Sequence, residues 1–286
     1  MNPLEPDVNV DPTTTKMLVP TLEDMRRLTW FAAASYCPAT FLAKWDCRFC
    51  RKVDHKIEFL AELVHSKMET SGYVALDHTS KKIIITYRGT NNSANRVTNL
   101  KINTVPFRAV PKKNVQVHTG FLESATSLLP QTKKMIKEIK NNPKTKNYKY
   151  MFTGHSLGGA MAVLVAIQLK NDLGIKWSDI TIVTYGQPRT GNIPFAQWFN
   201  RQPVAVARVV NANDPVPHLL GGQTRYFAHH QHEIFLDPSY KRGQKTPRLC
   251  SDKILEDPSC SNRIGAALYE SDAHSIYFDA DYRIPC

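Results

Sequence analysis

One short stretch of the sequence constrains the fold of this chain more than any other: Gly154-His155-Ser156-Leu157-Gly158-Gly159. It contains the pattern G-x-S-x-G, which places a serine on a sharp turn between a strand and a helix. The segment 148–153 before it predicts a strand, and the apolar segment 160–167 after it predicts a buried helix. Such a bend crowds the backbone, which is why glycines flank the serine. The alternative, a glycine-rich helix start with an idle serine, does not account for this setting.

The rest of the sequence predicts alternating strands and helices. Thr21 is a suitable N-cap for a helix over 21–36, with acidic residues in its first turn. We expect a helix over 121–140 and strands over 72–77, 82–88, 179–185, 205–211 and 233–236. This order predicts an α/β fold with a largely parallel central sheet and helices on both faces. Residues 1–20 are expected to form an irregular arm before a single domain over 21–286.

The net charge is +12, and much of the excess comes from lysines between residues 133 and 149. Apolar residues recur there at roughly helical spacing: Leu128, Leu129, Met135, Ile136 and Ile139. The lysines are therefore expected on the outer face of an amphipathic helix. Aromatic residues do not alternate with them as a nucleic-acid platform requires, which argues against a nucleic-acid partner. Attraction to anionic lipid surfaces fits the charge better.

The cysteines indicate the compartment. They form an even set near the two ends of the chain: Cys37, Cys47, Cys50, Cys250, Cys260 and Cys286. A zinc site is disfavoured, because there is one C-x-x-C and no matched histidine pair. We expect a secreted protein with disulfides, whose leader has been removed, rather than a cytosolic protein with six free thiols. No apolar run approaches the roughly 18 residues that a membrane helix needs.

A serine nucleophile needs a base and an acid that orients the base. Where the serine stands on a strand-to-helix turn of the G-x-S-x-G type, called the nucleophile elbow, the order along the chain is serine, acid, histidine. Asp214 directly follows the strand expected over 205–211; the alternative is an ordinary turn aspartate before proline. His274 lies beyond the acid and is the best candidate for the base. The other histidines considered are interpreted as loop, strand or structural residues: His118, His155, His218, His229, His230 and His232.

The negative charge that develops on an attacked carbonyl oxygen needs two hydrogen-bond donors. The N–H of Leu157, directly after the nucleophile, is the first expected donor. The second is expected at an earlier junction between a strand and a loop. The segment 87–90 ends a predicted strand with a glycine and a hydroxyl residue, Thr90, and suits that role.

These residues lie in segments that together resemble the fungal class 3 lipase family. The resembling segments are Tyr87-Arg88-Gly89-Thr90, Val117-His118-Thr119-Gly120-Phe121, 152–160, 185–192 and Asn213-Asp214-Pro215-Val216-Pro217. The resemblance runs in order over residues 22–286 and is closest to secreted yeast triacylglycerol lipases. It implies that Ser156, Asp214 and His274 are the catalytic triad. It also implies that Thr90 and Leu157 form the oxyanion hole.

The resemblance further implies how the cysteines pair. Local spacing favours Cys47–Cys50 and Cys250–Cys260, and the family supports a third bond between Cys37 and Cys286 that ties the two chain ends together. The family also implies a lid over about 91–103 that covers the acyl groove. Here the lid offers a small apolar stripe with a basic residue near a position that often holds tryptophan: Ala94, Arg96, Val97 and Leu100. We therefore expect only modest interfacial activation.

The function implied by the resemblance is that of a secreted α/β-hydrolase-fold lipase. It would act as a monomer on acylglycerols at a lipid–water interface, through an acyl-enzyme, with no metal, cofactor, nucleic acid or integral membrane segment. A feruloyl or other carboxylesterase is an alternative, because one fold serves many substrates. A catalytically silent lipid-binding relative is a third interpretation, against which the complete triad argues.

Overall fold

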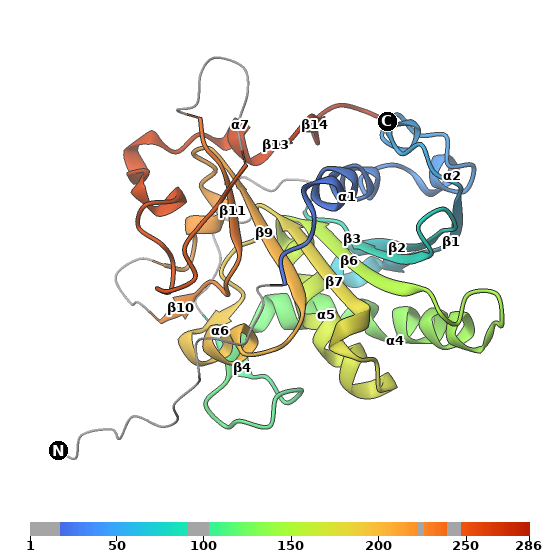
Figure 1. Cartoon of the computed structure of the whole chain (residues 1–286), viewed down its shortest axis with the longest axis horizontal. Coiled ribbons are helices and arrows are strands. Elements are labelled where there is room, and N and C mark those ends of the chain that lie inside the picture. The colour runs from blue at the N-terminus through green and yellow to red at the C-terminus, as the bar shows by residue number, and fades with distance from the viewer. Residues whose placement is uncertain (1–17, 91–102, 222–225, 239–246) are drawn as a thin grey trace.

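A twisted eight-stranded sheet forms the centre of the molecule (Figure 1). The computed structural model describes residues 18–90, 103–221, 226–238 and 247–286. The strand order across the sheet is β1 (Ile57–His65), β2 (Thr70–Asp77), β3 (Lys82–Tyr87), β6 (Lys149–His155), β7 (Ile180–Tyr185), β9 (Ala205–Asn211), β11 (Glu233–Leu236) and β12 (Pro247–Leu249). The five strands from β3 to β11 pair in parallel, and the pairs at both edges are antiparallel. The predicted parallel sheet is confirmed, with antiparallel edges added.

Smaller elements surround this sheet. A second sheet has the order β10 (Phe227–Ala228), β8 (Gly191–Asn192), β5 (Gln116–His118) and β4 (Thr104–Pro106), and β13 (Ile276–Tyr277) pairs with β14 (Ala280–Asp281). The α-helices are α1 (Leu22–Ala34), α2 (Ala39–Leu42), α4 (Thr119–Asn141), α5 (Leu157–Leu173), α6 (Ile193–Asn200) and α7 (Ser271–His274). Short 3-10 helices span Cys50–Lys52, Ser66–Met68, Trp177–Asp179, Val216–His218, Ser261–Arg263 and Ala266–Leu268.

The two faces of the sheet carry separate apolar cores. Side chains alternate along each strand, so in β6 Phe152 packs with α4, α5 and α6, whereas Met151 packs with α1. The β13–β14 hairpin near the C-terminus joins α1 on that second face, as Figure 1 shows. The helix after the elbow, α5, is buried on nearly all sides between the sheet and α4. The arrangement therefore fixes the turn before α5 from both sides.

Several expected elements have the bounds that the sequence indicates. Thr21 caps α1, and its Oγ1 accepts a hydrogen bond from Asp24 N at 3.0 Å. The strands β9 and β11 begin and end at the expected residues. The lysines of α4 lie at its surface, while its apolar stripe is buried. The edge strand β1 was not expected, because its leucines, alanine and glutamates have no strong preference for strands.

Three disulfides close the structure. They join Cys37 to Cys286, Cys47 to Cys50 and Cys250 to Cys260, so all six cysteines are paired. The first connects the segment after α1 to the last residue of the chain. Within the described ranges, no helix is both long and apolar enough to cross a membrane.

Candidate active site

Ser156 lies at the turn between β6 and α5. Its φ of 57° and ψ of −127° are costly for a residue with a side chain, of order 1–3 kcal/mol. A backbone hydrogen bond from Ser156 N to Tyr185 O, 2.8 Å long, holds the turn against β7. Gly158 is required here, because a Cβ at that position would lie 2.1 Å from Tyr87 O. The elbow expected from the sequence is therefore present, with its strain compensated by packing around it.

The segment after β3 runs directly against this elbow. A Cβ on Gly89 would lie 3.0 Å from Ser156 Cβ and 2.8 Å from His155 O, so only glycine allows this approach. The next residue, Thr90, has a buried Oγ1 with no hydrogen-bond partner among the described residues. Leu157 is the first residue of α5, where a backbone N–H has no partner within the helix. The two residues expected in the oxyanion hole thus lie in the two segments that meet at Ser156.

His274 and Asp214 form a buried hydrogen-bonded pair. His274 Nδ1 donates to Asp214 Oδ2 at 2.9 Å, and Val216 N donates to Oδ1 at 2.8 Å. The Tyr277 hydroxyl also donates to Oδ2. Burial alone would raise the pKa of Asp214, but the charge and hydrogen bond of His274, with those of Tyr277 and Val216, hold the pKa below its ordinary value. The carboxylate therefore stays ionised and fixes the histidine ring.

The pair lies beside the elbow. The ring centres of His274 and His155 are 4.4 Å apart, and His155 Nε2 donates to the His274 carbonyl oxygen at 2.7 Å. Because Nδ1 of His274 donates to the carboxylate, its Nε2 is the free acceptor. Both that Nε2 and Ser156 Oγ are buried without a partner in the described part of the chain. A catalytic serine and its base can lie beyond hydrogen-bond distance until substrate binds, so the free Nε2 suits His274 to accept the serine proton.

The histidines of the segment 229–232 have other contacts. His229 Nε2 donates to Pro217 O at 2.7 Å, His230 contacts Gln187, and His232 contacts Asp252. Burial, and then the charge of Arg208, lower the pKa of His229 and of His230 well below its ordinary value. Both rings are therefore neutral structural groups, and in the described part of the chain neither forms a hydrogen bond with the Asp214 carboxylate.

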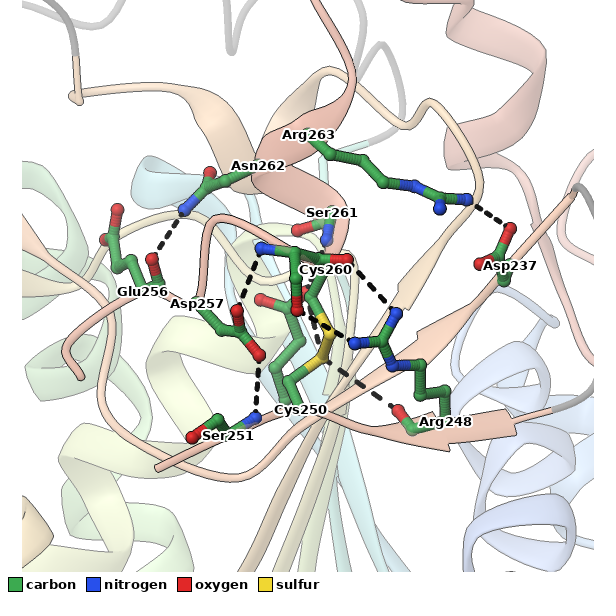
Figure 2. Close-up of a disulfide and its surroundings, with 12 residues drawn as sticks. Asp237, Arg248, Cys250, Ser251, Glu256, Asp257, Cys260, Ser261, Asn262 and Arg263 are labelled. Atoms are coloured by element: carbon green, nitrogen blue, oxygen red, sulfur yellow. Dashed lines mark hydrogen bonds and ion pairs between the residues drawn. A yellow bond between two sulfur atoms is a disulfide. The ribbon is translucent and has the colours of Figure 1, made fainter. Parts of the chain in front are cut away.

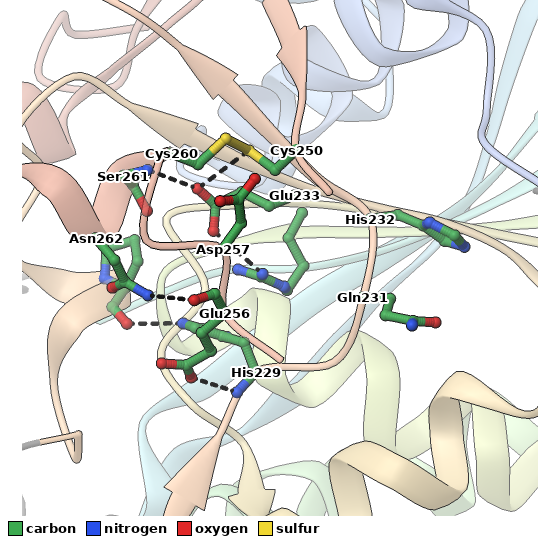
Figure 3. A network of polar contacts seen from close by, with 12 residues as sticks. His229, Gln231, His232, Glu233, Cys250, Glu256, Asp257, Cys260, Ser261 and Asn262 are labelled. Atoms are coloured by element: carbon green, nitrogen blue, oxygen red, sulfur yellow. Dashed lines mark hydrogen bonds and ion pairs between the residues drawn. A yellow bond between two sulfur atoms is a disulfide. The ribbon is translucent and has the colours of Figure 1, made fainter. Parts of the chain in front are cut away.

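A partly buried ion pair supports the loop that carries Asp214. Arg189 binds both carboxylate oxygens of Glu256, at 2.7 and 2.8 Å, and also donates to Leu219 O. Glu256 in turn accepts a hydrogen bond from His229 N, as Figure 3 shows. Around the Cys250–Cys260 disulfide, Asp257 accepts from the backbone of residues 251 and 259, and Arg248 binds residue 259 (Figure 2). Nothing in the sequence motifs identified these supports.

One grouping of metal-ligand types occurs within the described ranges: Glu233, Cys250 and Cys260, whose ligand atoms lie within 4.8 Å of one another. The two sulfurs are bonded to each other, and a disulfide offers no thiolate to a metal ion. This grouping is therefore a structural disulfide with a buried glutamate beside it. Glu233 accepts a hydrogen bond from Ser261 N and pairs with Arg208.

The lid residues expected from the sequence lie outside the described residues: Ala94, Arg96, Val97 and Leu100. The N-terminal arm, except for its last three residues, also lies outside them. Tyr277 and Tyr36, which contact Asp214 and His155 respectively, were missed by sequence reasoning. Neither stands in a motif, and only the packing of the C-terminal segment against α1 and the elbow brings them to the site.

Comparisons with known proteins agree with this geometry. The family model described as Lipase (class 3) matches residues 84–223. The chain is 30% identical to a lipase of Rhizopus niveus over 260 residues, which is 90% of this chain and 64% of that protein. It is 36% identical to secreted mono- and diacylglycerol lipase 1 of Fusarium solani over 161 residues, which is 56% of this chain and 46% of the relative. The chain thus spans less than two thirds of the length of these curated relatives.

Solved structures cover the chain more fully. The structure of a triacylglycerol lipase described as having a serine protease triad at its catalytic centre matches with a TM-score of 0.78 and 30% identity, over 92% of this chain and 97% of that one. The fold, the elbow and the Asp–His pair define an α/β-hydrolase-fold protein. The chain belongs to the class 3 lipase family.

Proposed function

We propose that this chain is a triacylglycerol lipase that works through an acyl-enzyme on Ser156. One arrangement carries the proposal: a strained serine lies between the Gly89–Thr90 segment and the N-terminus of α5, beside a buried Asp214–His274 pair. Each part of this arrangement has a role in ester hydrolysis and none is needed to stabilise a passive lipid-binding fold. The backbone strain in particular is explained by a nucleophile.

In the first half-reaction, Ser156 Oγ attacks the ester carbonyl carbon while His274 Nε2 takes the hydroxyl proton. The ionised Asp214 holds the proton on Nδ1 and stabilises the imidazolium that forms. The negative oxygen of the tetrahedral intermediate receives hydrogen bonds from Thr90 and from the N–H of Leu157. Each such donor stabilises the transition state by about 3 kcal/mol.

The intermediate collapses when His274 gives its proton to the leaving alcohol, which leaves as a diacylglycerol. Water then takes the place of the alcohol, His274 removes one of its protons, and the attack on the acyl carbonyl repeats the same charge development. The fatty acid leaves and Ser156 regains its proton. The residues alone complete this cycle, because every proton moves between Ser156, His274 and the two oxygens of substrate and water.

An acylglycerol is the substrate class that the surroundings favour. The short helix Ala266–Leu268 lies against the loop that carries Asp214, because Asn213 Nδ2 donates a hydrogen bond to Leu268 O. The Leu268 side chain is exposed, with 64% of its surface accessible. An exposed leucine next to the site suits contact with a lipid phase. The relatives named as lipases act on the same kind of ester. Secretion is part of the proposal, and the three disulfides support it, because they persist in oxidising compartments.

The test is a panel of esters with wild-type protein and Ser156→Ala: emulsified long-chain triglyceride, a monoglyceride and a diglyceride, methyl ferulate, and a dissolved short-chain ester. We expect acid release from the triglyceride and from the short ester, and none from either substrate with Ser156→Ala. Faster turnover of ferulate than of any glyceride would assign a different esterase. Substantial turnover by the alanine variant would mean that another residue is the nucleophile.

A second part of the proposal concerns the lid expected over 91–103. The apolar face that the sequence predicts for this lid is small. At about 25 cal/mol per Å² of apolar surface buried, contact with a lipid interface therefore stabilises the open lid only a little. A lipid surface shifts a lid only by its differential interaction with the open and closed forms. We therefore propose modest interfacial activation of a monomeric enzyme. Rate measured against ester concentration through the solubility limit tests it, and a sharp rise from almost no rate would contradict it.

A further inference from the structure

A chain of hydrogen bonds passes behind the candidate active site and uses neither the triad nor the oxyanion donors. The Tyr36 hydroxyl, just after α1, lies 2.7 Å from His155 Nδ1. His155 Nε2 lies 2.7 Å from the carbonyl oxygen of His274. At the other end, the Tyr36 hydroxyl lies against the backbone of Gly89: a Cβ on Gly89 would lie 2.5 Å from it, and the Gly89 backbone acts to lower the Tyr36 pKa. The chain therefore joins the segment before Thr90 to the backbone of the triad histidine.

Each atom in this chain has one allowed role. The His274 carbonyl can only accept, so His155 carries its proton on Nε2. A neutral ring then has an acceptor at Nδ1, and the Tyr36 hydroxyl must donate to it. That leaves the Tyr36 oxygen as an acceptor that faces the Gly89 backbone. Burial, and then the nearby His274, lower the pKa of His155 to about 3, so the ring remains neutral at working pH.

The surroundings hold these groups in place. The Tyr282 ring stacks on His155 with centres 4.3 Å apart, and meets Tyr36 edge-on at 5.8 Å. Cys37, next to Tyr36, is bonded to Cys286, which ties the end of α1 to the C-terminal segment. The Tyr36 pKa is raised by burial, so its hydroxyl does not ionise and keeps its proton for His155. The chain of bonds is thus a fixed part of the fold.

We propose that Tyr36 and His155 are positioning residues. They hold the oxyanion segment, residues 87–90, and the backbone of His274 in fixed positions relative to Ser156. This inference rests on the proposed serine-hydrolase function. Neither side chain is assigned a contact with the substrate or the reacting atoms. Their effect is on the two groups that must meet in the transition state, which are the oxyanion donor and the base.

Removing the Tyr36 hydroxyl leaves His155 Nδ1 buried without a partner and removes the contact with the Gly89 backbone. Both ends can then shift by fractions of an ångström. A displacement of about 1 Å at a reacting group costs about 100-fold in rate. Because the ground-state ester does not depend on this alignment, we expect Tyr36→Phe to lower kcat about 10- to 100-fold with little change in KM.

The matched control is Tyr282→Phe, which also removes one buried tyrosine hydroxyl in the same cluster but one bonded to Thr29. Both variants and wild type are compared by kcat and KM on a dissolved short-chain ester, by melting temperature, and by Kd for an alkyl boronic acid, which forms a tetrahedral adduct on the serine. We expect Tyr36→Phe to weaken boronic acid binding in proportion to its loss in kcat. Tyr282→Phe should change kcat and boronate Kd less than threefold.

A second variant tests the connection itself. His155→Leu removes both the donor to the His274 carbonyl and the acceptor for the Tyr36 hydroxyl. If the two residues act as one unit, the double variant Tyr36→Phe/His155→Leu should have a kcat no lower than that of the more impaired single variant. If Tyr36→Phe does not fold, the kcat and boronate Kd of His155→Leu make the same test.

The inference is overturned if folded Tyr36→Phe keeps kcat within twofold of wild type, if its KM rises instead of kcat falling, or if the two single losses multiply in the double variant. Failure of the proposed function would look different. In that case Ser156→Ala would keep its turnover, or wild type would hydrolyse none of the esters.

Discussion

The close approach of Gly89 to Ser156 gives a sharp prediction for Gly89→Ala. The new Cβ would lie 2.8 Å from His155 O, whereas ordinary van der Waals contact begins at 3.4 Å. The segment must therefore move away from the elbow by about 0.6 Å, and it takes Thr90 with it. The same Cβ would push against the Tyr36 hydroxyl, 2.5 Å away, so movement in that direction is also blocked.

An oxyanion donor acts within a narrow range, about 2.7–3.1 Å from the oxygen it stabilises. A displacement of this size removes most of the hydrogen bond from Thr90, and loss of one donor costs about 100- to 1000-fold in kcat. We expect Gly89→Ala to lose that much on a dissolved short-chain ester, with KM changed less than threefold. The assay is steady-state hydrolysis at saturating ester, together with a melting curve to show that the variant is folded.

The control is Gly265→Ala. Gly265 has a φ of −69°, and nothing lies within 4 Å of an added Cβ, so kcat should stay within twofold of wild type. A folded Gly89→Ala enzyme with the kcat of wild type would contradict this prediction, because residues 87–90 would then tolerate the displacement. A loss shared equally by Gly265→Ala would point to a general effect of the substitution.

Three further results are expected. Asp214→Asn should lower kcat by about 10⁴-fold in single-turnover hydrolysis, because the amide favours the wrong tautomer of His274; a loss below tenfold would contradict the pair. Replacing Cys37 and Cys286 by serine should destabilise the fold by up to about 5 kcal/mol, a drop in melting temperature of roughly 10 °C, and an unchanged melting temperature would show that the bond constrains little. The pKa values of buried His155, His229 and His230 are lower in the folded state than the ordinary histidine value. The free energy of unfolding should therefore be highest above about pH 6.5 and fall as pH falls, by at most about 4 kcal/mol per pH unit for the three groups together. Equal urea midpoints at pH 7 and pH 5 would contradict this.

The elements that determine the topology could be predicted from the sequence. The elbow requires a strand before Ser156 and a helix after it, and the strands over 205–211 and 233–236 are continuous and apolar enough to stand out. The edge strand β1 could not be predicted in this way. Its residues suit a helix as well as a strand, and pairing with β2 decides the outcome.

Some residues of the candidate site could also be predicted from the sequence, and others could not. Ser156, Asp214 and Thr90 follow the carboxyl ends of parallel strands, so their meeting at one edge of the sheet follows from the order of the elements. Tyr36 and Tyr277 come from a helix end and a C-terminal hairpin. Their positions depend on how those segments pack on the second face of the sheet, which no local pattern encodes.

The proton position on His155 is a further property that only the structure gives. In the sequence it is one histidine among ten, next to the nucleophile. Its two ring nitrogens acquire different roles because a carbonyl lies at one and a hydroxyl at the other. Both partners are 119 residues away along the chain.

The central claim is that Ser156 carries the acyl group during turnover. The most direct measurement is rapid acid quench of the enzyme with an excess of a short-chain nitrophenyl ester, followed by peptide mass spectrometry. We expect a burst of one nitrophenol per chain and an acyl mass on the peptide that contains Ser156. An acyl mass on another residue, or steady turnover with no acylated peptide, would contradict it.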